Sequence, residues 1–321
     1  MLTLHRVLCP VDFSDPSRRA LRHALAISRW HESELTVLHA EDVLLHAASV
    51  QAVGDRELAA RHYQELRELI DGAGGKGRNV KVHVVTGDPV SKILEHAAHD
   101  ASNVIVMGTH GRSGLTRAVL GSVTERVVRQ SSTPVLTIPP SAELRDDLMP
   151  FDTILCAADF SPACREALDI AILMGQEADA RLILLHALQL PDFDPGIVPV
   201  PRPVSARTEY STFRKDALRR LKCGLPADAV FRCRPELFVA EGRPADVILQ
   251  TASREDAKLI VMGVQTRGAL DRLIFGSTTR SVMHAATCPV LSIRASPGAE
   301  SEFPLRSLSA ACTQGFRGSF D

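Results

Sequence analysis

One segment of the sequence has the composition expected of a phosphate-binding loop. GTHGRSGLTRAVLGSVTER, residues 108–126, holds four glycines, three arginines and several hydroxyl side chains. Glycines expose backbone N–H groups and let a ligand approach the chain closely. Ser122 opens a helix whose N-terminus favours an anion, and Thr124 adds a further hydroxyl. The segment therefore predicts a phosphate site.

The same residues also permit a purely structural interpretation. SVTE, residues 122–125, fits a capping box with Ser122 at the N-cap and Glu125 three residues later. The glycines would then only form a turn. The segment contains neither a P-loop pattern nor G-x-G-x-x-G, so the common nucleotide motifs do not decide between the two interpretations.

A carboxylate at the end of a strand is the second candidate. The strand expected over 5–11 is followed directly by Asp12. In open α/β sheets a ligand binds beyond the carboxyl ends of the strands, where the strand order reverses. If the order is 3-2-1-4-5, the first and fourth strands flank that reversal, and Asp12 and Gly108 meet at one crevice. Asp12 and the corresponding Asp159 could instead anchor the turn that follows each strand.

Alternating apolar and amphipathic runs define the elements that position these residues. Strands are expected over 5–11, 35–40, 80–86, 103–108 and 134–138, and helices from near Ser14, over 55–70, over 89–99 and from 121–122. Continuously apolar strands that alternate with helices predict a parallel sheet covered on both faces.

The chain contains this arrangement twice. Residues 6–40 align without a gap on 153–187, residues 86–108 on 241–263, and residues 121–138 on 276–293. The extra residues of the second copy fall in a Pro-rich stretch, 190–204, which predicts a loop. We therefore expect a first domain over 1–140, a linker over 141–150, a second domain over 151–296 and a disordered tail over 297–321.

Composition excludes several classes of function. The 321 residues are 45% hydrophobic with a net charge of -1, so charge gives no case for nucleic-acid or anionic membrane partners. No apolar run is long enough to span a bilayer, and the N-terminal segment recurs inside the chain, so we expect a cytoplasmic protein. The seven cysteines form no C-x-x-C pair, and the matched His39 and His186 stand at strand ends. We expect buried cysteines and hydrogen-bonded structural histidines, with no metal site.

The glycine spacing resembles a known signature. Gly108-x2-Gly111-x9-Gly121-Ser122 closely resembles the ATP-binding signature of the universal stress protein family, and VLCPVDFS, VLHA and TPVLTI also resemble that family. The resemblance covers 4–140 and, more loosely, 152–295, so the chain looks like a tandem member. It implies two flavodoxin-like, or Rossmann-like, domains, each a five-stranded parallel sheet of order 3-2-1-4-5 with helices on both faces.

The resemblance also implies an ATP site, with or without Mg²⁺. Asp12 would recognise the adenosine end, Ala40 would contact adenine through its backbone, and the helix start at 121–124 would hold phosphates. The implied first-domain residues are Pro10, Val11, Asp12, Ala40, Met107, Gly108, His110, Gly111, Gly121, Ser122, Val123 and Thr124. Family members commonly dimerise through strand five, so we expect either a homodimer or the same pairing between the two halves of one chain.

The second copy departs from the signature. Thr266 replaces the middle glycine, Ala157 replaces Pro10, and Arg280 replaces Glu125, which removes the capping box and puts a cation near the helix start. The residues still compatible with binding are Asp159, Ala187, Met262, Gly263, Gly276, Ser277, Thr278 and Thr279. We expect the first domain to bind ATP and the second to bind more weakly.

Three functions remain open at this point. The first is a nucleotide-dependent stress-response regulator that acts on an unidentified protein partner. The second is a scaffold that works through dimer contacts without nucleotide. The third is a slow ATP hydrolase; phosphoryl transfer needs metal ligation and a positioned base, and the sequence offers one candidate carboxylate per crevice, so we assign no catalytic residue.

Overall fold

A computed structural model describes residues 4–109, 120–142, 144, 151–189, 204–226, 235–264 and 276–295. The expected Pro-rich loop over 190–203, the tail over 297–321 and most of the linker lie outside these residues.

The strands of the first half are separated by helices, in the order that the amino-acid sequence predicts. Its elements are β1 (Arg6–Pro10), α1 (Asp15–Trp30), β2 (Glu34–Glu41), α2 (Val43–Val53), α3 (Asp55–Ile70), the short π-helical turn η1 (Asp71–Gly75), β3 (Val80–Thr86), α4 (Pro89–His99), β4 (Val104–Gly108), α5 (Ser122–Gln130) and β5 (Val135–Ile138). The predicted helices over 55–70 and 89–99 coincide with α3 and α4.

The second half repeats the plan. Its elements are β6 (Thr153–Ala157), α6 (Pro162–Ala178), β7 (Arg181–Leu188), α7 (Val204–Gly224), β8 (Glu236–Glu241), α9 (Pro244–Arg254), β9 (Leu259–Val264), α10 (Ser277–Ala285) and β10 (Val290–Arg294).

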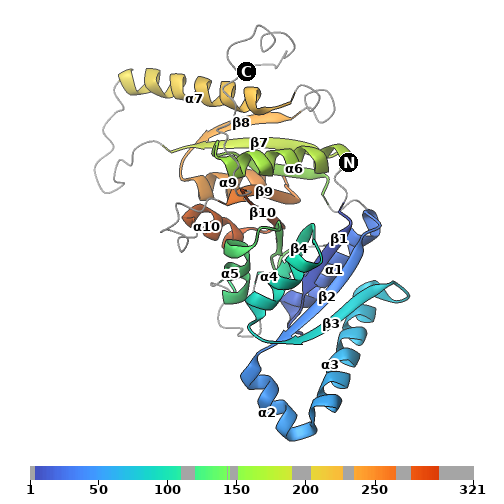
Figure 1. The fold of residues 1–321 in the computed structure, drawn as a ribbon. Helices are drawn as coiled ribbons and strands as arrows, with labels where there is room; N and C mark the ends of the chain where they lie inside the picture. Colours follow the sequence, from blue (N-terminus) through green and yellow to red (C-terminus); the bar gives the residue numbers. More distant parts are fainter. Residues whose placement is uncertain are drawn as a thin grey trace.

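The ten strands of the described residues form one sheet. Their order is β3-β2-β1-β4-β5-β10-β9-β6-β7-β8, so each half has the predicted order 3-2-1-4-5 and the two halves meet at β5 and β10 (Figure 1). Pairing is parallel within each half, and β5 and β10 pair antiparallel, with Leu136 opposite Leu291. The strand-five contact that we expected between two domains is thus formed within this chain.

Helices cover both faces of the sheet because successive strand residues point to opposite sides. Val7 and Cys9 of β1 belong to the core layer beneath α1 and α6, whereas Leu8 belongs to the layer beneath α4, α5, α9 and α10. Each layer contains residues from both halves, so the apolar core is continuous across the joint. Four of the described cysteines, Cys9, Cys156, Cys164 and Cys288, are buried as predicted.

The first helix of each half starts in the same way. The Ser14 hydroxyl caps α1 by accepting from Ser17 N–H, and the Ser161 hydroxyl caps α6 by accepting from Cys164 N–H. A proline stands in the first turn of each helix, where its missing N–H costs nothing. The capping residue therefore fixes where each helix leaves the carboxyl edge of the sheet.

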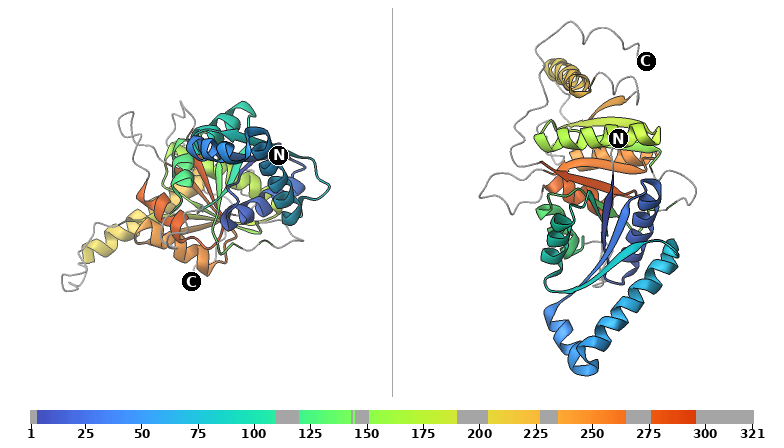
Figure 2. Two further views of the ribbon diagram at one scale, coloured as in Figure 1. Left: turned by 90° about the horizontal axis from the view of Figure 1, so that it is seen from below. Right: turned by 45° about the vertical axis from the view of Figure 1, so that its right-hand side comes forward.

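One helix of the first half is missing from the sequence-based expectation. Residues after β2 form α2, which packs mainly against α3. The sequence VLLHAASVQAV is apolar on nearly every side, so it has no helical stripe to detect. Figures 1 and 2 show α2 and α3 extending together away from the body of the first half, and we call residues 43–70 the α2–α3 arm.

Candidate functional site

The crevice predicted in the first half lies where the strand order reverses. β1 pairs with β2 on one side, with Pro10 opposite Leu38, and with β4 on the other, with Leu8 opposite Ile105. The chain leaves β1 for α1 and leaves β4 for α5, and these two connections diverge at the carboxyl edge. This is the position at which open α/β sheets bind ligands.

Gly108 is required by packing at the end of β4. A Cβ atom on Gly108 would lie 2.8 Å from the carbonyl carbon and oxygen of Pro16, in the first turn of α1. The second half repeats this approach, because a Cβ atom on Gly263 would lie 2.5 Å from the carbonyl carbon of Ala163. This glycine therefore brings the helix start onto the strand end in both halves, independently of any ligand.

The carboxylate after β1 anchors a strained turn. Asp12 Oδ1 accepts from Ser14 N–H at 3.1 Å and from the Ser14 hydroxyl at 2.5 Å. Between them Phe13 has φ of 64°, which is rare for a bulky residue and is often found at functional sites. Asp159 accepts from Ser161 N–H at 3.0 Å, and Phe160 repeats the φ of 64°. Both carboxylates therefore anchor the turn that follows their strand, which is the structural alternative that the sequence left open.

The matched histidines are hydrogen-bonded structural residues, as predicted. His39 Nδ1 lies 2.8 Å from Val11 O, and His186 Nδ1 lies 2.7 Å from Ala158 O. Burial lowers the pKa of His186, while its bond to Ala158 O partly opposes that shift. Each histidine ring packs against the phenylalanine of the strained turn, with centroids 4.6 Å and 4.4 Å apart.

The start of α5 differs from the predicted capping box. Gly121 is the N-cap, Ser122 is the first helical residue, and no described side chain caps the helix. The capping-box assignment of Ser122 and Glu125 was wrong because the helix begins at Ser122, one residue earlier than that motif requires. The Thr124 hydroxyl donates to Gly108 O at 2.8 Å, so it ties the helix start to β4. The first N–H groups of α5 therefore have no capping side chain among the described residues.

The fold brings most of the predicted first-half residues to one edge. Those with a described position are Pro10, Val11, Asp12, Ala40, Met107, Gly108, Gly121, Ser122, Val123 and Thr124. Val11, Met107 and Thr124 are buried, Asp12 and Ala40 are partly exposed, and Ser122 is exposed. His110 and Gly111 lie outside the described residues, as do Thr266 and Gly268 of the second half.

The second crevice carries a cation that sequence reasoning did not identify. The Arg220 guanidinium from α7 lies 4.0 Å from the centre of the Phe160 ring, beside Asp159 and His186. The remaining predicted residues are in corresponding places at the strand and helix ends: Ala187, Met262, Gly263, Gly276, Ser277, Thr278 and Thr279. A pattern search could not find Arg220, because α7 follows the unmatched Pro-rich segment.

Arg280 makes a contact that the sequence did not predict. Its Nε lies 3.9 Å from Glu125 Oε2. Arg280 occupies the position in the second half that Glu125 occupies in the first, so corresponding residues of the two halves face each other across the joint. Both side chains stand in the first turn or just beyond it, on α10 and α5. The substitution therefore makes an ion pair between the halves, partly exposed and weak by the usual standard for such pairs.

A second group missed from the sequence borders Ala40. Glu41 Oε2 lies 2.9 Å from His46 Nδ1 and 3.7 Å from His62 Nδ1, while His46 Nε2 lies 3.4 Å from Asp55 Oδ1. This carboxylate–histidine group, Glu41, His46, Asp55 and His62, links the end of β2 to the α2–α3 arm. Glu41 corresponds to Leu188 in the second half, so the link has no counterpart there.

Two flavodoxin-like α/β units, each with a crevice at its switch point, define the class of this protein. The sequence profile of the Universal stress protein family matches residues 3–139 and again residues 150–294. The chain therefore belongs to the universal stress protein family and carries two family domains in tandem.

Some relatives match most of the chain, and others match about half of it. A universal stress protein of Mycolicibacterium smegmatis is 25% identical over 300 residues, which cover 91% of this chain and 98% of that protein. One of Mycobacterium tuberculosis is 27% identical over 247 residues, covering 75% of this chain and 77% of that protein. A shorter one of Thermus aquaticus is 35% identical over 147 residues, covering 45% of this chain and 99% of that protein.

Solved structures share the tandem architecture. A universal stress protein from Archaeoglobus fulgidus matches with a TM-score of 0.61 and 23% identity, covering 91% of this chain and 97% of that chain. At this identity the likeness shows the fold. Among the described helices of the present chain, none is both long and apolar enough to cross a membrane.

Proposed function

We propose that the first half binds ATP in the crevice between β1 and β4. The observation that carries the proposal is the start of α5, which no described side chain caps and which shares the carboxyl edge with Asp12 and Ala40. Uncapped N–H groups at a helix start, together with the helix dipole, favour phosphate. The resemblance of the glycine spacing to the family's ATP signature supports the same assignment.

The residues of this crevice suit the parts of an adenine nucleotide. Backbone N–H groups at 122–124 would hold phosphates, since the Gly121 N–H already donates to Thr109 O and the Thr124 hydroxyl to Gly108 O. Asp12 would accept from a ribose hydroxyl, and the backbone of Ala40 would contact adenine. His110 and Gly111 would complete the phosphate loop, and Met107 with Val11 would form its apolar floor. Mg²⁺, where present, would accompany the phosphates.

The second half is proposed to bind more weakly. Ala157 lacks the rigid ring that Pro10 has at the corresponding position of the first half. Thr266 is β-branched, so it does not let a phosphate approach the backbone as closely as Gly111 does. Arg220 adds a cation over the Phe160 ring and near His186, which changes the charge of this crevice relative to the first. Gly276 and the start of α10 keep the same uncapped form as in the first half.

Bound nucleotide is proposed to act as a signal rather than as a substrate for rapid turnover. ATP would order the segment between β4 and α5 and so change a surface that a protein partner reads. A scaffold that works without nucleotide is the alternative, and slow ATP hydrolysis is a further one. These alternatives differ in what happens when the phosphate site alone is blocked.

Nucleotide carried through purification is the first test. The protein is purified from cells and denatured, and the released nucleotide is identified and counted by chromatography. About one ATP per chain would support binding in the first half only, because one of the two crevices carries the full signature. Two per chain would contradict the weaker second half, and none would leave titration with added ATP to decide.

Matched variants locate the site. Gly121 and Gly276 have φ of -58° and -55° with ψ of 134° and 129°, which valine also adopts, so neither substitution strains the backbone. By isothermal titration, Gly121→Val should abolish ATP binding, and Gly276→Val should leave the main site intact. Full stress survival in cells with Gly121→Val would favour the scaffold, and equal ATP affinity in both variants would overturn the assigned site.

A further inference from the structure

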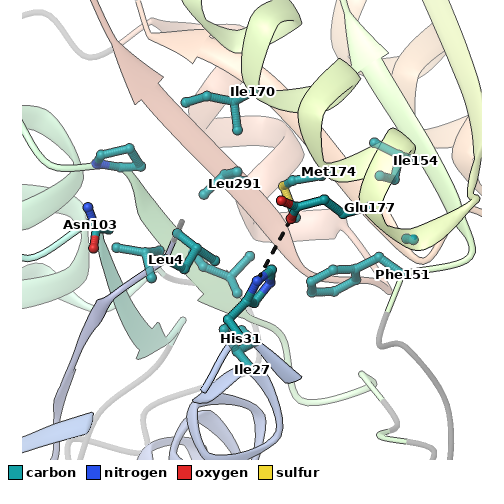
Figure 3. A pocket seen from close by; sticks show the side chains of 14 residues that line it. Leu4, Ile27, His31, Asn103, Phe151, Ile154, Ile170, Met174, Glu177 and Leu291 are labelled. Atoms are coloured by element: carbon teal, nitrogen blue, oxygen red, sulfur yellow. Dashed lines mark ion pairs between the residues drawn. The ribbon is translucent and has the colours of Figure 1, made fainter. Parts of the chain in front are cut away.

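A cavity of about 140 Å³ lies between the two halves, away from either crevice (Figure 3). Its walls come from α1, β4 and β5 on one side and from β6, α6 and β10 on the other. The lining residues are Leu4, Ile27, His31, Asn103, Val104, Pro134, Leu136, Phe151, Ile154, Ile170, Met174, Glu177, Ala178 and Leu291. Leu136 and Leu291 are the register partners that join β5 to β10.

The size and lining suit a small apolar molecule. Eleven of the fourteen lining side chains are apolar. A cavity of roughly 150 Å³ with aliphatic and aromatic walls stays dry and takes up benzene. The body of a ligand here would therefore be about the size of one aromatic ring.

Glu177 gives the cavity one unsatisfied polar group. Its Oε2 is buried and has no hydrogen-bond partner among the described residues. His31 Nδ1 approaches to 3.8 Å, beyond hydrogen-bond range, and Figure 3 shows these two side chains facing each other across the cavity. The third polar side chain, Asn103, already accepts from Arg6 N–H at 2.9 Å through its Oδ1.

His31 does not neutralise this carboxylate near neutral pH. Burial lowers the pKa of His31, and the nearby Glu177 opposes that shift only in part. A carboxylate in an apolar cavity lacks the water that would solvate it, so a cationic donor is favoured there. Both side chains are slightly exposed, 14% and 17%, which places the opening of the cavity beside them.

We propose that this joint cavity is a binding site for a small apolar amine, with the ring or branched body against the leucines of the joint and the ammonium donating to Glu177 Oε2. The ammonium supplies the donor that the oxygen lacks, and the apolar body fills the space that the two halves leave. Neither half alone forms the site.

The position of the cavity connects it to both crevices. The first turn of α1 packs Pro16 on Gly108 at the first crevice, and the C-cap residue of the same helix, His31, stands in the cavity wall. α6 has the same arrangement, from the close approach at Gly263 to Glu177. An amine in the cavity would therefore contact the far ends of the two helices whose starts border the crevices.

The test uses the full chain without added nucleotide, so its outcome is independent of the ATP proposal. Benzylamine, toluene and benzoate are titrated by saturation-transfer NMR. We expect saturable binding of benzylamine, weaker binding of toluene and none of benzoate. Absence of saturable benzylamine binding would overturn the proposal, and equal binding of toluene would overturn the assigned amine class.

Variants tie the binding to the cavity. Glu177→Gln keeps the shape but removes the charge, and should weaken benzylamine by about tenfold, the size of a charge-assisted hydrogen bond. Ala178→Leu should reduce binding by filling the space. Glu95→Gln, an exposed residue of α4 in a surface pair, should change nothing. Urea unfolding confirms that each variant is folded; if Ala178→Leu is not, Glu177→Gln decides, and unchanged affinity there would show that the amine binds elsewhere.

Discussion

Gly108 belongs to the motif that suggested a nucleotide site, yet its position also has a reason in packing. The glycine lets the first turn of α1 lie on the end of β4, and Gly263 does the same for α6 in the second half. Gly276, the second-half counterpart of Gly121, has room for a Cβ, which would meet only Thr279 Oγ1 at the ordinary contact distance of 3.8 Å. The same sequence motif thus contains glycines with different physical roles.

This difference predicts unequal effects of one substitution. Gly108→Ala places a methyl 2.8 Å from the Pro16 backbone, which cannot rotate away, so we expect the free energy of unfolding to fall by about 1–3 kcal/mol. Gly276→Ala meets only Thr279 Oγ1 at 3.8 Å, and its effect should be within about 0.5 kcal/mol. Urea denaturation measures both, and equal losses would contradict the packing argument.

His23 predicts how stability depends on pH. This α1 side chain is 3% exposed, and burial lowers its pKa below the ordinary histidine value, although the bond to Arg19 O partly opposes the shift. The unfolded chain therefore binds the proton more readily than the folded chain. The contribution to stability is complete above about pH 6.5 and is lost as the pH falls through that value toward the folded pKa.

The measurement is the free energy of unfolding in urea at several pH values between neutral and mildly acidic. We expect stability to decline on acidification and His23→Gln to reduce the slope. His99→Gln serves as the control, because the His99 side chain is 87% exposed. A His23→Gln slope equal to that of the parent would refute the assignment.

At the scale of elements, hydrophobic periodicity predicted the helices that pack an apolar face on the sheet and missed the helix that does not. α3 and α4 present apolar stripes to the sheet, and their bounds follow from the sequence. α2 buries few of its described side chains and is apolar on nearly every side, so it has no apolar stripe from which the helix could be predicted. The start of α5 at Ser122 agrees with the prediction, but its capping does not, because Gly121, with no side chain, occupies the N-cap position that the capping box assigned to Ser122.

Within the α2–α3 arm, α3 packs its apolar stripe into the core, whereas α2 depends on the carboxylate–histidine group. Leu44 is 80% exposed and Val43 is 56% exposed, so apolar burial does little to retain α2. Glu41 contacts His46 of α2 and His62 of α3, so one side chain ties α2 to the core-packed α3. Because Glu41 adjoins Ala40, the arm begins directly at the proposed adenine position.

Removing this anchor should loosen α2 more than the rest of the protein. We expect Glu41→Gln to accelerate amide hydrogen exchange in residues 43–53, because regions with few buried contacts open locally at low cost. Glu57→Gln, which breaks only a surface pair with Arg61, is the matched control. Exchange that stays at the parent rate in 43–53 would show that α2 is retained by other contacts.

At the scale of the whole molecule, the antiparallel pairing of β5 and β10 turns two repeats into one sheet. The repeat was evident in the sequence, and the family resemblance indicated strand five as the contact, but the residues alone did not decide whether that contact would form within one chain or between two. The Thr137 hydroxyl donates to Val290 O at 3.2 Å, and Arg294 donates to Gln130 O at 3.2 Å, so polar contacts reinforce the joint. Both apolar layers continue across it.

A shared core predicts that the two halves unfold together. Trp30, the single tryptophan of the chain, stands at the end of α1 and reports on the first half, whereas far-UV circular dichroism reports on both. We expect the two signals to change over the same urea range, as in a two-state transition. Leu291 lies in the second half and is 5% exposed. It is the register partner of Leu136 in the first half.

Leu291→Ala should therefore move the Trp30 transition although the substitution is in the other half. Loss of a buried leucine lowers the free energy of unfolding by about 2–5 kcal/mol, and the shared layers spread that loss over both halves. Leu44→Ala, at the exposed position on α2, should leave the Trp30 midpoint nearly unchanged. If Leu291→Ala instead split the dichroism into two steps and left the Trp30 midpoint in place, the halves would be independent folding units joined only at their edges.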